Sequence, residues 1–375
     1  MFIFSFIIKP IAVVYQYLFT IADNAFCIYN RHMNIFVCIL ITFAIVGLLD
    51  KLQNGKWGLA GCIDQALNTM GNLCLSLLGF YCLFVTLADQ LDLSFLRLHP
   101  SSSVIIGSLL APDLGGLPLI QSYIHDPATF FLTGVFLTST LGCLISFQFP
   151  IFLGQLKPKE HPLFMEGVTY GLLGLIPILL LLSLQIDLVL LIPLFCIYGL
   201  LFLGLWKNKS LLLRILQYFA KGIEIIGLLC FGIVLLSYFF HLPYVSMNTL
   251  LDGLLLVFQI TMIVAGSHVL CQLILHYAKK PLQSFARFCG IETMTLIGLL
   301  LSLGSSIAIL PLYPKMSPEG KRINAAFCVS GAYALGGQMG FIAAMTDTKT
   351  TFFFIVFKLT GGLLAIYLTK RKSQK

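Results

Sequence analysis

Two long apolar stretches of this chain are each interrupted near the middle by small, polar or proline residues. The first, residues 102–123, is broken by the run Pro-Asp-Leu-Gly-Gly at 112–116, and the second, residues 290–312, by Gly-Ser-Ser at 304–306. Backbone that leaves the helical conformation inside a membrane survives only where protein or a water-lined cavity satisfies it. Paired interruptions of this kind in two halves of a chain are typical of the binding sites of membrane transporters.

The composition places the chain in a lipid bilayer. Its 375 residues are 58% hydrophobic and only 10% charged, whereas about a quarter of the residues in soluble domains are charged. The net charge of +8 does not indicate nucleic-acid binding, because the Lys and Arg residues lie in short loops between apolar runs. We therefore expect a bilayer partner, no nucleic-acid partner and no separate soluble domain.

Eleven apolar segments follow an apolar extension at residues 1–30, which we expect to form an extra helix. A membrane-spanning helix needs about 20 mostly apolar residues. The segments lie at 34–49, 66–88, 102–123, 128–150, 165–184, 185–205, 216–240, 250–276, 290–312, 323–346 and 352–369.

The distribution of basic residues favours two segments that do not cross. If all eleven segments cross, Lys and Arg divide almost evenly between the two faces. If the two broken segments enter and leave by the same face, 17 basic residues collect on one side and only Arg31, Arg97 and Lys349 on the other. An excess of this size marks the cytoplasmic side. We predict a multi-pass protein of the cytoplasmic (inner) membrane, with its lysine-rich loops and C-terminus in the cytoplasm.

The same arrangement makes the two halves equivalent at an offset of about 191 residues. We predict an all-α polytopic fold with about 9–12 transmembrane segments, built from two five-segment inverted repeats that each contain a broken or re-entrant helix. The expected units are an extension at 1–30, a first repeat at 31–184, a connecting helix at 185–210 and a second repeat at 211–375. Broken helices that still cross the membrane are the alternative.

Asp113 and the serine pair Ser305 and Ser306 are the first candidates for substrate contacts. An ionised carboxylate near the bilayer centre costs a few kcal/mol, and a cationic ligand would offset that cost. Each of these polar groups has an alternative role as the cap of a half-helix. Free carbonyls at the ends of the leading half-helices, near Ala111 and Leu303, would add partial negative charge. The breaks thus favour a small cation.

Three further polar residues lie in the segments that follow the breaks: Gln148, Asn324 and Gln338. Glutamine is costly to bury in lipid, so we expect both glutamines to line a pathway, and we include Asn324 among the substrate contacts. His268 is more typical of a packed, hydrogen-bonding residue than of a proton relay. The cysteines form no metal-ligand pattern, and we predict neither a metal nor a cofactor.

Two other classes of protein remain as alternatives. An integral membrane enzyme acting on a lipid or its head group would need several titratable groups at one depth, and a channel would show a continuous polar stripe. The sequence leaves the oligomeric state open, including a homo-oligomer.

Several runs resemble the bacterial ethanolamine permease family associated with ethanolamine utilisation. These runs are GSLLAPDLGGLPL at 107–119, MSPEGKRINAAFCVSGAYALGGQMGF at 316–341 and MGNLCLSLLG at 70–79. The resemblance covers residues 34–370 and implies a permease for a small protonated amino alcohol, with Asp113 on the family's Asp. The chain departs from the family at Gly337-Gln338, where the family usually has Asp-His, and at Ser305-Ser306, where it has two Asn. These departures weaken the assignment of the substrate.

Overall fold

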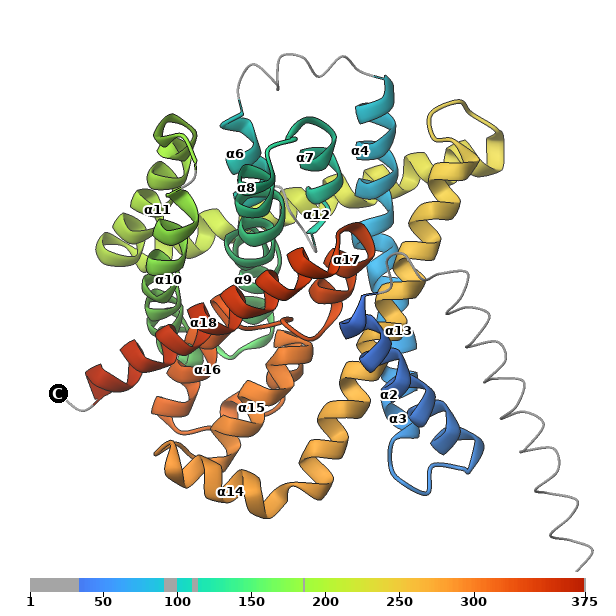
Figure 1. Cartoon of the computed structure of the whole chain (residues 1–375). Coiled ribbons are helices and arrows are strands. Elements are labelled where there is room, and N and C mark those ends of the chain that lie inside the picture. Colours follow the sequence, from blue (N-terminus) through green and yellow to red (C-terminus); the bar gives the residue numbers. More distant parts are fainter. Residues whose placement is uncertain (1–33, 91–99, 110–113, 185, 374–375) are drawn as a thin grey trace, which may run out of the picture.

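The computed structural model describes residues 34–90, 100–109, 114–184 and 186–373, and every regular element in these ranges is helical. Figure 1 shows the helices packed into one bundle. The predicted extension at 1–30 lies outside the described residues. The all-helical prediction is confirmed for the part of the chain that is described.

The described residues of the first half form these α-helices: α2 (Ile35–Leu52), α3 (Ala60–Leu73), α4 (Gly79–Gln90), α6 (Ser102–Leu109), α7 (Leu117–Tyr123), α8 (Pro127–Phe130), α9 (Phe149–Gln155) and α10 (His161–Ser183). Three π-helical stretches join some of them: η1 (Cys74–Leu78) links α3 to α4, and η3 (Phe131–Gly142) and η4 (Leu144–Gln148) link α8 to α9.

The helix α11 (Leu188–Lys207) connects the halves. The second half contains α12 (Lys209–Phe240), α13 (Met247–Tyr277), α14 (Lys279–Phe288), α15 (Thr293–Gly304), α16 (Pro318–Ser330), α17 (Gly337–Met345) and α18 (Thr348–Ser373), with short 3-10 turns η6 (Ser306–Ile309) and η7 (Tyr313–Lys315).

Seven helical stretches in the described part of the chain are long and apolar enough to cross a membrane, or up to eight if one bent pair counts as a span. The bent pair is Lys280–Phe288 with Thr293–Gly304, which meet at 105°. The seven are Ile35–Leu52, Pro127–Gln155, Pro158–Ser183, Leu188–Lys207, Ser210–Phe240, Met247–Tyr277 and Thr348–Arg371. These stretches indicate a multi-pass membrane protein.

Both broken segments fold back so that their two ends meet. In the second, α15 stops at Gly304; its 12 residues reach about 18 Å, well short of a hydrocarbon core of about 30 Å. The chain then returns, and the Ser317 amide donates to the Glu292 carboxylate at 3.2 Å beside the start of α15. In the first, the hydroxyls of Ser102 and Tyr123 lie 3.4 Å apart. Each broken segment is therefore a hairpin.

The segment expected as one helix at 323–346 is instead two helices, which corrects that prediction. Helix α16 ends at Ser330 and α17 begins at Gly337. Tyr333 between them has a left-handed backbone, with φ of 61°, a conformation that costs about 1–3 kcal/mol for a non-glycine residue and clusters at functional sites. The run is apolar overall, but Gly331 and Gly336 lie at either end of the break.

Two pairs of corresponding helices in the two halves begin 191 residues apart. Helix α15 begins at 293 against 102 for α6, and α16 begins at 318 against 127 for α8. Helices α8 and α16 also begin alike, because each has a proline in its first turn and a side-chain N-cap, Asp126 and Ser317 respectively. An N-cap oxygen satisfies one of the amides that open a helix.

The contacts between the halves occur in reciprocal pairs. Helix α2 packs against α13 and its counterpart α12 packs against α4; likewise α10 packs against α16 and α18 packs against η3. A Cβ added at Gly266 on α13 would overlap the Leu40 carbonyl of α2, and one at Gly79 on α4 would meet the Phe231 amide of α12 at 2.5 Å. Reciprocal contacts of this kind are what a two-fold relation between units produces.

Equivalent positions meet where α10 crosses α18. A Cβ at Gly174 would lie 2.7 Å from the Ala365 amide, and these two positions are 191 residues apart. In a two-fold arrangement only residues on the axis touch their own equivalents. The crossing of α10 and α18 thus brings two equivalent positions of the halves into contact.

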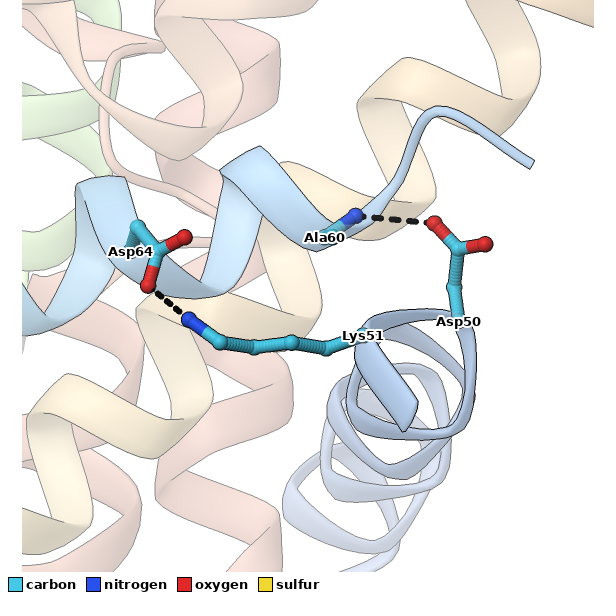
Figure 2. Close-up of polar contacts among 4 residues, drawn as sticks. All are labelled: Asp50, Lys51, Ala60 and Asp64. Atoms are coloured by element: carbon cyan, nitrogen blue, oxygen red, sulfur yellow. Dashed lines mark hydrogen bonds and ion pairs between the residues drawn. The ribbon is translucent and has the colours of Figure 1, made fainter. Parts of the chain in front are cut away.

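The turn from α2 to α3 is held by one buried carboxylate. Asp50 accepts backbone hydrogen bonds from Trp57 and Leu59 at 2.7 Å and from Ala60 at 2.9 Å. Lys51 pairs with Asp64 on the exposed side of the same turn. Figure 2 shows both contacts, with the carboxylate of Asp50 facing the start of α3 and the ion pair alongside.

We predict that Asp50→Ala lowers the free energy of unfolding by roughly 2 kcal/mol or more, because it leaves buried amides without partners. Lys51→Ala, which removes an exposed ion pair from the same turn, is expected to cost about 1 kcal/mol at most. Thermal unfolding of the purified protein in detergent measures both. Equal losses would contradict the role given to Asp50.

A second prediction tests the reciprocal packing. Gly79→Ala and Gly266→Ala should each destabilise the protein by about 1–3 kcal/mol, because the added methyl overlaps a neighbouring backbone. Gly222→Ala on α12 is the matched control, since a Cβ there meets nothing within 4 Å. The control should be neutral or stabilising, since alanine is the better helix former. Tolerance of alanine at either tested glycine would argue against the close approach.

Candidate functional site

A cavity of about 620 Å³ opens at the break after α15. It lies between the two largest apolar cores of the described structure: Phe147 and Ile307 belong to the first, Ile260 and Phe341 to the second. Its polar lining consists of Gln65, Thr69, His268, Gln272, Ser305, Tyr333 and Gln338, with Cys62 and Cys271. A mostly apolar cavity with a few convergent polar groups is the usual form of a small-molecule site.

The break after α15 and the break between α16 and α17 meet at this cavity, and amides of the second break bond to carbonyls of the first. The amide of Tyr333 donates to the Ser302 carbonyl and that of Leu335 to the Leu303 carbonyl, both at 2.9 Å. The expectation of a free carbonyl at Leu303 is therefore wrong: this acceptor is engaged by the α16–α17 link. Gly336 completes the junction, because a Cβ at this position would overlap the Gly304 carbonyl oxygen.

Of the six predicted substrate contacts, Ser305 and Gln338 line the cavity. Ser306 is fully buried, and its hydroxyl lies 2.8 Å from that of Tyr333, which lines the cavity. The break at 304–306 thus presents one serine to the cavity and uses the other to hold a lining side chain.

Gln148 and Asn324 are engaged elsewhere in the bundle. The Gln148 amide nitrogen donates to the Cys328 carbonyl at 3.0 Å, which ties η4 to α16. The Asn324 amide nitrogen donates to the carbonyls of Thr295 and Gly320 at 3.2 and 3.1 Å, which ties α16 to α15. Both side chains therefore fix the elements around the cavity. Asp113 lies outside the described residues.

Lys358 is a buried charged residue that the sequence analysis did not single out. Its side chain on α18 is 1% exposed, and the ammonium donates to the Ser139 carbonyl at 2.7 Å and to the Gln338 side-chain oxygen at 2.6 Å. It also lies 5.3 Å from the centre of the Phe354 ring. A single lysine within an otherwise apolar span was the available signal, since charges inside membrane segments are rare and functional.

The bond from Lys358 determines which way the Gln338 amide points. An ammonium group donates and has no acceptor, so its partner on Gln338 must be the oxygen. The amide nitrogen of Gln338 then points the other way. Among the described residues no group pairs with this nitrogen, which is buried.

Comparison with protein families agrees with this architecture. Residues 33–371 match the family model described as "Ethanolamine utilisation protein, EutH". The chain belongs to the EutH family. The match covers both hairpins and the cavity between the cores, so the whole site falls inside the family's shared region.

The individual relatives are distant from this EutH-family chain. It is 28% identical to the "Probable ethanolamine permease EutH" of Listeria monocytogenes over 91% of this chain and 95% of the relative. It is 30% identical to the "Uncharacterized protein YxeR" of Bacillus subtilis, over 88% and 92%. It is 26% identical to the "Probable ethanolamine permease EutH" of Escherichia coli, over 88% and 93%. No solved structure matches the chain.

We predict that Gly336→Ala separates the two breaks and destabilises the protein by about 1–3 kcal/mol, because a methyl group cannot occupy the space of the Gly304 carbonyl. Gly154→Ala on α9, where a Cβ meets nothing within 4 Å, is the control. Differential scanning fluorimetry of both variants in detergent measures the effect. An unchanged midpoint for Gly336→Ala would mean that the junction accommodates a side chain.

Proposed function

We propose that this EutH-family protein is a permease that carries a small, polar, cationic solute such as ethanolamine across the cytoplasmic membrane. The observation that carries the proposal is the cavity where the break after α15 meets the α16–α17 link, between two separate apolar cores. Interrupted helices that meet at a cavity are the usual site of substrate binding in secondary transporters. Relatives named as ethanolamine permeases support the choice of solute.

The two repeats are proposed to be inverted, with the hairpins entering from opposite faces. The reciprocal packing and the contact between the equivalent positions Gly174 and Ala365 support a two-fold relation. In Figure 1 the α6–α7 hairpin lies at the top of the bundle and α15 lies in its lower half, next to α14 at the bottom. The faces then differ in charge, and the lysine-rich face, which includes α14, is the cytoplasmic one.

The proposed ligands are Asp113 for the ammonium, with Ser305 and Gln338 as neutral hydrogen-bonding groups. Helix α15 ends at Gly304, so its C-terminal end brings partial negative charge to the cavity, where a cation is favoured. Ser306, Gln148 and Asn324 contribute by holding Tyr333, α16 and α15 in place.

Alternating access is proposed to occur along the boundary between the two cores. The first core includes parts of α10, α11 and α16, and the second includes parts of α2, α3, α13 and α17. Because the cavity lies on this boundary, a rocking or sliding of one core against the other would open it to each face in turn.

The test is uptake of labelled ethanolamine into proteoliposomes, with and without an imposed proton or sodium gradient. The wild-type protein should accumulate or equilibrate label above empty liposomes, and the gradients distinguish facilitated diffusion from ion coupling. Asp113→Asn should abolish uptake and ligand-dependent thermal stabilisation, because it removes the proposed counter-charge. Asp64→Asn, which alters an exposed ion pair, should leave uptake unchanged. Uptake that persists in Asp113→Asn would remove Asp113 from the site.

A further inference from the structure

Two buried polar atoms without partners belong to residues that line the same cavity. One is the side-chain nitrogen of Gln338 and the other is the Nδ1 atom of His268. Among the described residues neither has a hydrogen-bond partner. A buried polar atom left without a partner costs about 1–3 kcal/mol, so each needs a ligand or an ordered water to offset that cost.

The two atoms have opposite hydrogen-bonding character. Lys358 holds the Gln338 oxygen, so the free Gln338 nitrogen is a donor. The Nδ1 atom of His268 is buried and without a partner among the described residues. In the neutral ring that carries its proton on Nε2, this Nδ1 atom is a hydrogen-bond acceptor. The cavity therefore offers one donor and one acceptor.

The helix ends beside these atoms reinforce the same polarity. Gln338 is in the first turn of α17, whose N-terminal end carries partial positive charge. His268 lies beside the last residue of α15, since a Cβ at Gly304 would be 3.9 Å from its ring. This C-terminal end carries partial negative charge. An electron-rich group is favoured at Gln338 and a cationic donor is favoured at His268.

From this arrangement we infer that the cavity recognises both ends of a short primary amino alcohol. Gln338 binds the hydroxyl oxygen of the ligand, and His268 binds its ammonium N–H. Lys358 is a positioning residue that keeps the Gln338 donor aimed at the ligand. The inference rests on the proposed function and adds the basis of its selectivity. It requires an N–H on the ligand, so a quaternary amine lacks the donor that His268 needs.

The experiment measures dissociation constants of the full-length protein for ethanolamine, ethylamine and choline by isothermal titration calorimetry. Ethylamine lacks the hydroxyl, and choline lacks the N–H. Wild type should bind ethanolamine about three- to tenfold more tightly than ethylamine, the value of one hydrogen bond, and should bind choline more weakly than either. The ratio of the ethylamine and ethanolamine constants isolates the hydroxyl contact.

The variants separate the three roles. Gln338→Leu should bring the ratio close to one, and Gln338→Glu, which keeps a partner for Lys358 but offers no donor, should do the same. Lys358→Met should lower the ratio while ethylamine binding is unchanged. His268→Leu should weaken both amines and preserve the ratio. Gln155→Leu makes the same change at an exposed glutamine of α9 outside the cavity and should keep the wild-type ratio.

The outcomes are distinguishable from failure of the proposed function. If ethanolamine binds and the ratio is the same in wild type and Gln338→Leu, the inference is overturned and the permease proposal stands. Choline binding as tight as that of ethanolamine overturns the role of His268. If wild type binds none of the three amines, both the inference and the choice of an amine substrate fail.

Discussion

Backbone groups that leave the helical pattern inside an apolar interior need hydrogen-bond partners, and in this protein two breaks provide partners for each other. The carbonyls that end α15 accept from the amides of Tyr333 and Leu335 in the α16–α17 link. Without these bonds the same groups would need other protein groups or water in the cavity as partners. The requirement brings the hairpin tip, the start of α17 and the adjoining face of α13 to one place. The cavity is the space that remains there.

The location of this junction between two apolar cores links the fold to the proposed transport. A site inside one core would be enclosed by close-packed side chains that move together. Here the lining is divided, with Phe147 and Ile307 on one side and Ile260 and Phe341 on the other. The hydrogen bond from Lys358 on α18 to Gln338 on α17, and the one from Gln148 to Cys328, position the polar lining at that boundary.

The sequence was sufficient for features that follow from local composition and from counting charges. It located the break at Gly304-Ser305 and the fold-back of the broken segments, and its offset of 191 residues matches the starts of α15 and α16. The inverted orientation of the repeats stays a prediction. The sequence did not reveal the split of 323–346, because the glycines Gly331 and Gly336 at the break are equally compatible with close helix packing and the strained Tyr333 depends on tertiary hydrogen bonds. It also missed Lys358, since the partners of that residue are 20 and 219 positions away in the chain.

The departures from the family pattern at 337–338 acquire a physical meaning in this setting. A side chain at Gly337 would meet only ordinary contacts, with Val264 at 3.5 Å and Ile260 at 3.6 Å, so the absence of an acid there is not enforced by lack of space. Gln338 supplies what a neutral site needs, an oxygen for Lys358 and a nitrogen for a ligand. In the proposed site, which has no acid at 337, recognition of an amino alcohol would depend on directed hydrogen bonds from Gln338 and His268.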